Sequence, residues 1–180
     1  MKKPGSKGEH NLQKKFETEK RALAFYNSQL LQHLNPEMQQ FISEQEMVFI
    51  STSDAKGECD ASFRAGDNGF VIVLDKKTLL FPEYRGNGVL ASMGNISENP
   101  HIGMFFIDFY QNSVGLHVNG KAGILSNEEL TADLDLSRKI KMSSKKLGSR
   151  KPISWIKVDV EEAYIHCSKH IPLMQKIDKI

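Results

Sequence analysis

Residues 70–81 read FVIVLDKKTLLF, and this stretch decides the fold class. Apolar residues fill both ends, and the polar tripeptide Asp75-Lys76-Lys77 separates them. This pattern predicts two short strands, 70–74 and 78–81, joined as a β-hairpin. A tight connection of this kind makes the two strands antiparallel.

Two more strands are predicted before the hairpin. Residues 47–50 form a continuous apolar run that ends in Ser-Thr-Ser, and residues 54–57 indicate a turn. Residues 59–64 alternate, so successive side chains point to opposite faces of a strand. We expect Cys59, Ala61 and Phe63 on one face and Asp60, Ser62 and Arg64 on the other.

Strands and helices also follow the hairpin. Ser126 and Glu129 have the spacing of a capping box, which predicts a helix from there toward Ile140. Leu116 and Val118 alternate with His117 and Asn119, as expected of a half-buried strand. The predicted elements are a helix over 88–98, a buried strand over 101–108, a strand over 115–125, a loop over 142–152, a strand over 153–166 and a short C-terminal helix.

The N-terminal region is expected to contain a tail and two helices. Residues 1–11 are rich in Lys, Gly and Ser and predict a disordered tail. Apolar residues at helical spacing predict a helix over 12–34. Asn35 then offers an N-cap and Pro36 suits the first position of a second, short helix, whose buried side is formed by Met38, Phe41 and Ile42.

About seven strands separated by tight turns favour an antiparallel barrel over a doubly wound parallel sheet. The sequence therefore predicts a mainly β fold with flanking helices, a single domain over residues 12–180. The length of 180 residues is sufficient for one such domain with a buried core.

The composition indicates an ordinary globular protein. The net charge of +2 gives no strong attraction to nucleic acid, and basic runs at 2–7 and 139–151 are typical of solvated segments. No apolar run is nearly as long as a membrane helix, which needs about 20 apolar residues. The N-terminus has no apolar signal-peptide region, and two cysteines form no disulfide framework, so we expect a cytoplasmic protein with free thiols.

The sequence has no metal-binding motif, no dinucleotide-binding or phosphate-binding glycine loop and no GxSxG. Two segments remain as candidate sites. Residues 81–88, FPEYRGNG, place Arg85 between turn formers before a predicted helix, where it can bind a phosphate or simply lie in a solvated turn. Ser62 and Arg64 share the polar face of their strand, where they meet either a ligand or water.

Several segments, taken in order, resemble the FMN-binding barrel of pyridoxamine-phosphate-oxidase-related proteins. The resemblance covers about residues 40–170, most of the chain. The matching segments are STSD at 51–54, SFRAGD at 62–67, GF at 69–70, FPEYRGN at 81–87, GNI at 94–96, NP at 99–100, VNGKA at 118–122 and YIHCSK at 164–169, the last being similar to a signature of one uncharacterised branch.

The resemblance implies a split β-barrel that forms a homodimer with two FMN sites at the subunit interface. Arg85, Asn87 and Ser92 are implied near the phosphate, and Ser62 and Arg64 along the flavin or ribityl chain. His117 and Asn119 are implied on a strand lining the same cleft, with His166 and Lys169 reaching the site from the C-terminal side.

The implied activity is that of an FMN-dependent oxidoreductase acting on a small molecule, with an electron donor such as NAD(P)H. The compact Ser-Arg-Lys phosphate cluster of the vitamin-forming oxidase is not reproduced after Tyr84, and its Arg-rich C-terminal signature is replaced by His170-Ile171-Pro172-Leu173. These departures argue against pyridoxamine phosphate as the substrate. The alternatives are a flavin- or haem-binding stress or sensing module without rapid turnover, and a deazaflavin-dependent reductase.

Overall fold

A computed structural model describes residues 3–133, 136–138, 140, 151–166 and 168–177. The chain divides into two compact units, residues 1–31 and 32–180. Each unit is described by itself below. Within the described residues, no helix is long and apolar enough to cross a membrane.

The first unit contains helices α1 (Lys7–Lys15) and α2 (Glu19–Ser28). The predicted disordered tail is wrong from Lys7 onward, because Ser6 begins a helix with a capping box. The Ser6 hydroxyl accepts from the Glu9 backbone N–H at 3.1 Å, and the Glu9 carboxylate accepts from the backbone N–H of Ser6. The signal was the Ser-x-x-Glu spacing at 6–9.

The helix predicted over 12–34 is interrupted at residues 16–18 and ends at Ser28, so the prediction is wrong for residues 29–34. The Glu17 N–H bonds to the Lys14 carbonyl and the Thr18 N–H to the Gln13 carbonyl, at 3.2 and 2.9 Å. These two bonds form a Schellman C-cap, with Glu17 in the left-handed region at φ 56°. Glycine usually occupies that position, so the break could not be predicted from the residue types.

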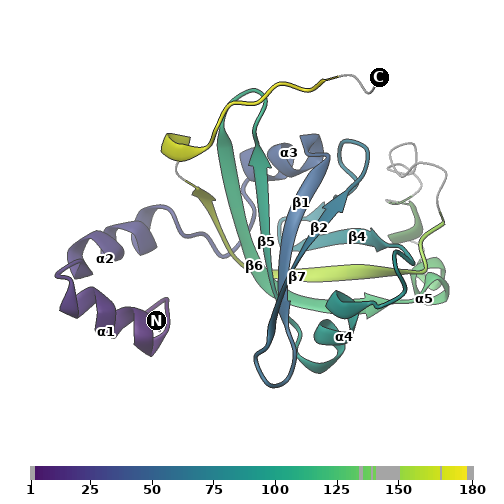
Figure 1. Cartoon of the computed structure of the whole chain (residues 1–180), viewed down its shortest axis with the longest axis horizontal. Helices are drawn as coiled ribbons and strands as arrows, with labels where there is room; N and C mark the ends of the chain where they lie inside the picture. Colours follow the sequence, from purple (N-terminus) through teal and green to yellow (C-terminus); the bar gives the residue numbers. More distant parts are fainter. Residues whose placement is uncertain (1–2, 134–135, 139, 141–150, 167, 178–180) are drawn as a thin grey trace. The chain divides into compact units, whose positions relative to one another are not determined.

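The second unit is built on one antiparallel sheet in the order β2-β1-β5-β6-β7-β4-β3, which confirms the predicted fold class (Figure 1). The hairpin quoted above is β3 (Ile72–Asp75) and β4 (Thr78–Glu83). The other strands are β1 (Met47–Ser53), β2 (Cys59–Ala65), β5 (His101–Asp108), β6 (Val114–Leu125) and β7 (Ser154–His166).

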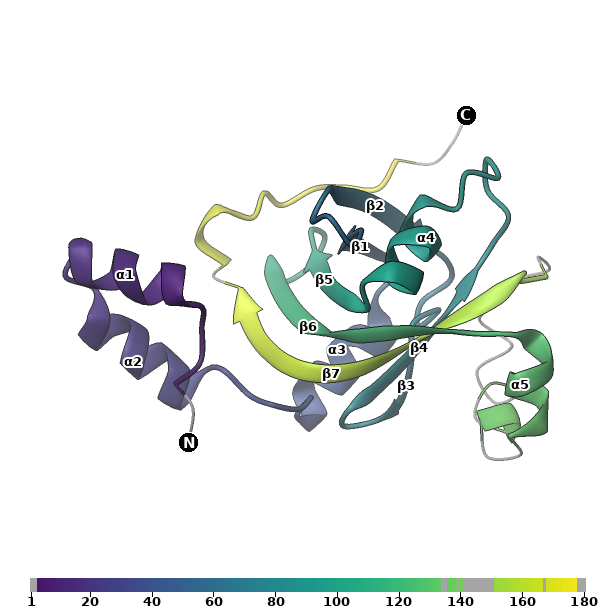
Figure 2. The same cartoon turned by 90° about the horizontal axis from the view of Figure 1, so that it is seen from below.

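The long strands β6 and β7 pair along most of their length and bend together (Figure 2). Their register shifts between Asn119 and Gly120, which marks a β-bulge. A Cβ on Gly120 would lie 2.2 Å from the Asp159 carbonyl oxygen, so only glycine fits where the two backbones approach. The bend turns the sheet around a common core.

Among the described residues, the helices beside the sheet include α3 (Pro36–Glu44), α4 (Ala91–Glu98) and α5 (Asn127–Ala132), and a 3-10 turn, η2 (Ser168–His170), follows β7. The predicted caps are confirmed, since the Asn35 side chain accepts from the Met38 N–H and Ser126 forms its capping box with Glu129. The helix predicted from Gly88 starts only at Ala91. The loop predicted over 142–152 lies outside the described residues up to residue 150.

The core of the second unit lies inside the curved sheet. Trp155 is buried and its indole N–H donates to the Asn127 side chain at 3.1 Å, beside Leu130 of α5. Other side chains are fully or almost fully removed from solvent, among them Val48, Ile50, Leu79, Leu80, Phe81, Met104, Phe106, Leu116, Val118, Ile156 and Val158.

Two strands with mainly apolar sequences are buried only at alternate positions. In β1, Val48 and Ile50 are in the core, whereas Phe49 is 42% exposed. In β5, the prediction of a buried strand over 101–108 is wrong for every second residue. The apolar run reflects a sheet whose outer face is also apolar, not a strand covered on both sides.

Candidate functional site

Five of the nine predicted site residues line one open pocket of about 510 Å³ between β2, the end of β4 and the start of α4. We call it the β2–α4 pocket. The five residues are Ser62, Arg64, Arg85, Asn87 and Ser92. They come from three separate segments, and the fold of the second unit brings them together.

The floor of the β2–α4 pocket is the polar face of β2. The predicted alternation is confirmed, since Asp60, Ser62 and Arg64 are partly buried and their neighbours in β2 are exposed. Arg64 donates from Nε to Glu83 Oε1 at 2.8 Å and from Nη1 to Ser62 Oγ at 2.8 Å. Glu83 is buried at the end of β4, so this ion pair fixes the guanidinium against the pocket wall.

One rim of the pocket is the loop between β4 and α4. Gly86, Gly88 and Leu90 all adopt positive φ angles, of 51°, 82° and 57°. The Asn87 side-chain oxygen accepts from the Val89 N–H at 3.0 Å, so it supports the loop and leaves its amide N–H groups for a ligand. Arg85 lies exposed in this loop.

The other rim is the N-terminus of α4. No side chain caps this helix end, and Leu90, Ala91 and Ser92 line the pocket. Ser92 is buried and donates from Oγ to Asp60 Oδ2 at 3.2 Å. Asn95 of the same helix donates to the buried Thr52 of β1 at 3.0 Å, which anchors α4 on the sheet.

His117, Asn119 and His166 lie elsewhere, on the outer face of β5, β6 and β7. His117 is stacked between Phe105 and Tyr164, with ring centroids 4.3 and 4.6 Å away. Its Nε2 lies 3.1 Å from His166 Nδ1. Burial, together with the charge of His166, lowers the pKa of His117 below its ordinary value, so the imidazole of His117 is neutral at pH 7.

The strand register aligns an aromatic row across this outer face. Phe63 pairs with Phe49, Phe49 with Phe105, Phe105 with His117, and His117 with Tyr164. A groove of about 260 Å³ runs beside the row and is lined by Phe49, Phe105, His117 and Asn119, among others. We call this surface the aromatic face.

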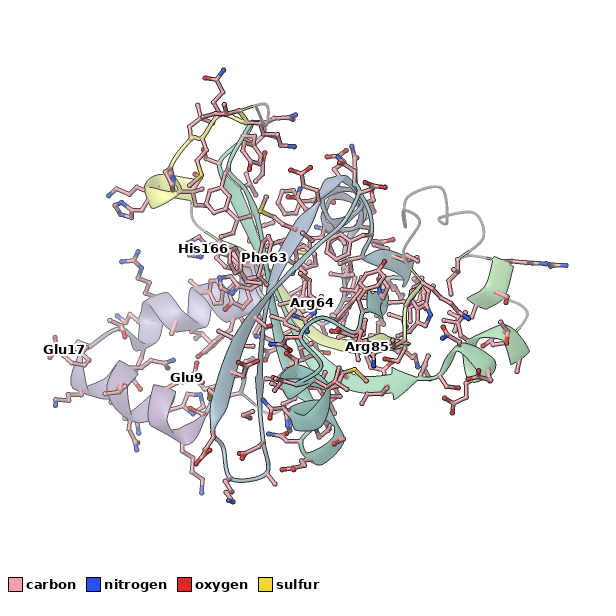
Figure 3. The ribbon with its side chains drawn as sticks, turned by 45° about the vertical axis from the view of Figure 1, so that its right-hand side comes forward. Glu9, Glu17, Phe63, Arg64, Arg85 and His166 are labelled. Carbon is pink, nitrogen blue, oxygen red and sulfur yellow. The ribbon has the colours of Figure 1, made fainter. Side chains whose placement is uncertain are left out.

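The resemblance implied one site at a subunit interface for all nine residues, and within a single chain these residues are divided. In β2, Ser62 and Arg64 point into the β2–α4 pocket, whereas Ala61 on the opposite strand face lines the groove of the aromatic face. Arg64 and Arg85 line the same pocket, and Figure 3 shows His166 apart from both. Lys169 is exposed in η2 and lines neither the pocket nor the groove.

Two carboxylates of the pocket, Asp60 and Glu83, were missed as site residues. The alternation of β2 already put Asp60 on the face of Ser62 and Arg64, so its position was readable. Glu83 was quoted within the FPEYRGNG segment, but its ion pair joins strands far apart in the sheet order. No group of three potential metal ligands occurs within the described part of the chain.

The chain was compared with family models, with curated protein sequences and with solved structures. The family model described as pyridoxamine 5'-phosphate oxidase matches residues 34–167. No curated protein sequence matches the chain. A HupZ variant from Group A Streptococcus is 21% identical with a TM-score of 0.54, covering 74% of this chain and 99% of its own.

A second similar structure is a putative pyridoxamine 5'-phosphate oxidase from Lactobacillus delbrueckii. It is 17% identical with a TM-score of 0.51, and the alignment covers 74% of this chain and 95% of that one. At these identities the two structures support the fold, and the site must be argued from the residues themselves.

Proposed function

Because the chain belongs to the pyridoxamine 5'-phosphate oxidase family, we propose that it is a flavoprotein that binds FMN non-covalently in the β2–α4 pocket. The observation that carries this proposal is the convergence of Arg64, Arg85 and the uncapped start of α4 on one open pocket. Cations, a helix N-terminus and hydroxyl donors are the groups that recognise a phosphate ester.

The phosphate is assigned to the rim formed by Arg85 and the start of α4. Arg85 is exposed, and its guanidinium presents a fork that matches two phosphate oxygens. The amide of Asn87 and the backbone N–H groups at the uncapped start of α4 add donors. Arg64 and Ser62, held together at 2.8 Å on the pocket floor, are assigned to the ribityl chain or the flavin edge.

We further propose a homodimer in which a second copy completes the site. A chain of this size has a filled barrel interior, so the flavin ring must lie in a surface cleft. On that cleft a two-fold related copy places a second set of side chains. We assign four residues to the set of side chains that the second copy contributes, because within one chain they lie outside the pocket. These residues are His117, Asn119, His166 and Lys169.

The aromatic face supplies an apolar surface for that interface. Phe49 and Phe63 are 42% and 52% exposed with ring centroids 5.4 Å apart. Aromatic side chains exposed as a group are unusual on a monomer surface and typical of an interface.

We propose an FMN-dependent oxidoreductase of a small molecule other than pyridoxamine phosphate, with NAD(P)H as an electron donor. Bound FMN would supply the hydride chemistry, and the protein supplies binding, orientation and electrostatics. The chain contributes charges at the phosphate end and neutral, stacked imidazole at the aromatic face. The cytoplasm is our proposal for its location, from the cysteine usage.

Haem binding without rapid turnover is the second candidate. The observation that favours it is the pair His117 and His166, whose nitrogens lie 3.1 Å apart on an aromatic surface. Imidazole is a common axial ligand of haem iron, and aromatic side chains suit a flat macrocycle. A deazaflavin in place of FMN is the third, since it would use the same phosphate rim.

Mass spectrometry of the small molecules released when the purified protein is denatured tests the proposal. We expect FMN, with flavin absorbance bands in the native protein. Bleaching by NAD(P)H and recovery in air supports an enzyme rather than a passive binder. A haem band with no flavin would overturn the proposal in favour of the second candidate, and a deazaflavin mass in favour of the third.

A further inference from the structure

A carboxylate of the pocket floor, Asp60, contacts the rim to which the phosphate is assigned, and a negative charge there disfavours phosphate binding. Asp60 Oδ2 accepts from Ser92 Oγ at 3.2 Å, and Ser92 is only 4% exposed. A hydroxyl has a single proton to donate. Ser92 therefore cannot donate to Asp60 and to a bound phosphate at the same time.

The charges of the side chains that line the pocket also do not favour a phosphate dianion. Its described lining contains two guanidinium groups, Arg64 and Arg85, and two carboxylates, Asp60 and Glu83, so the formal charges cancel. Arg64 is already paired with Glu83 at 2.8 Å. Arg85 alone among the described lining residues brings a positive charge with no carboxylate contact in the structure.

We propose that Asp60 is a specificity-determining residue that limits the affinity of the pocket for a phosphate dianion. The inference rests on the proposed function, since it concerns the phosphate end of the same flavin site. Asp60 engages the Ser92 hydroxyl and adds a negative charge beside it. Asp60 thereby reduces the difference in binding affinity between FMN and riboflavin. The size of this difference depends on that single residue.

The test compares FMN and riboflavin affinities of the full-length protein, measured by quenching of flavin fluorescence. Asp60→Asn keeps the size of the side chain and removes the charge. We expect it to tighten FMN binding about tenfold and to leave riboflavin binding unchanged, because like-charge repulsion acts on the phosphate alone. Asp67→Asn, an exposed aspartate that does not line the pocket, is the matched control and should change neither affinity.

Ser92→Ala, made in both backgrounds, separates competition for the hydroxyl from simple charge repulsion. In the wild type we expect FMN affinity to change by at most about twofold, because Asp60 already holds the Ser92 proton. In the Asp60→Asn background the new amide N–H can donate to Ser92 Oγ and leave the hydroxyl proton for the phosphate, so the same substitution should weaken FMN binding by at least about fivefold.

Equal FMN affinity of the wild type and Asp60→Asn would overturn this inference and leave the proposed flavin site intact. An equal effect of Ser92→Ala in both backgrounds would also overturn it, since the hydroxyl would then not be shared. A wild type that binds neither flavin contradicts the proposed function instead. Unchanged riboflavin affinity of Asp60→Asn verifies that the pocket is still folded.

Discussion

Arg64 on β2 donates to Glu83 on β4 at 2.8 Å and thereby joins the first and the sixth strand of the sheet order. β2 is the first strand in that order, and β4 is separated from it by β1, β5, β6 and β7. The pair can form only because the sheet curves back on itself. One contact therefore links two distant strands of the curved sheet and fixes the floor of the candidate site.

Arg64→Met should destabilise the protein by about 3 kcal/mol, because it leaves the buried Glu83 carboxylate without its cation. Denaturant unfolding of Arg64→Met, Glu83→Gln and the double variant measures the coupling. We expect the double variant to recover most of the loss, since both charges are then absent. Strictly additive losses would show that the two side chains act independently.

Gly120→Ala tests the bulge that bends β6 against β7. The added Cβ would meet the Asp159 carbonyl oxygen at 2.2 Å, and we expect a loss of about 3 kcal/mol in the free energy of unfolding. Gly123→Ala is the matched control in the same strand, because nothing lies within 4 Å of its added Cβ. Similar stability of the two variants would contradict the close approach of the backbones at the bulge.

The features of the fold and of the candidate site that could be predicted are those made by residues close together in the sequence. The alternation of residues 59–64 correctly separated Ser62 and Arg64 from Phe63, and the hairpin at 70–81 gave the antiparallel sheet. The capped starts of α3 and α5 were likewise readable, because an N-cap is made by residues adjacent in sequence.

The rest depends on tertiary structure. His117 meets His166 only through the register of β6 on β7, and the bulge after Asn119 shifts that register by one residue. A shift of one residue exchanges the faces of a strand, so spacing alone cannot decide which polar residues share a site. The Arg64–Glu83 pair needs barrel closure, and Glu17 ends α1 without the glycine that usually signals a C-cap.

Stability should fall as the pH is lowered from 7.5 to 5.5. The pKa of His117 is lowered in the folded protein by burial and by His166, so the unfolded chain binds protons more readily. The stabilising contribution is complete above the unfolded pKa of about 6.5 and is lost as the pH falls through the folded value. Thermal unfolding across this range measures the loss.

His117→Phe should reduce that dependence on pH, since it keeps the stacked row and removes the titrating group. A slope unchanged in His117→Phe would assign the pH dependence to other groups.

Light scattering of the FMN-loaded protein should give the mass of a dimer. Phe49→Lys places a charge in the aromatic row and should shift the protein toward the monomer with loss of flavin, because a buried lysine without a partner is costly. Ile153→Lys is the matched control, because Ile153 and Phe49 are both 42% exposed and Ile153 lies outside the aromatic row. A stable monomer that keeps its flavin at low micromolar concentration would contradict the shared site.

Titration of flavin-free wild type and Arg85→Ala with FMN and with riboflavin tests the central claim most directly. A charge-assisted contact of an arginine with a phosphate contributes about 1.5–3 kcal/mol, so Arg85→Ala should weaken FMN binding about tenfold to a hundredfold. Riboflavin binding should be nearly unchanged, and Arg21→Ala, outside the pocket lining, should alter neither. Failure of the wild type to bind FMN at micromolar concentration, or equal loss of both flavins in Arg85→Ala, would contradict a phosphate site at Arg85.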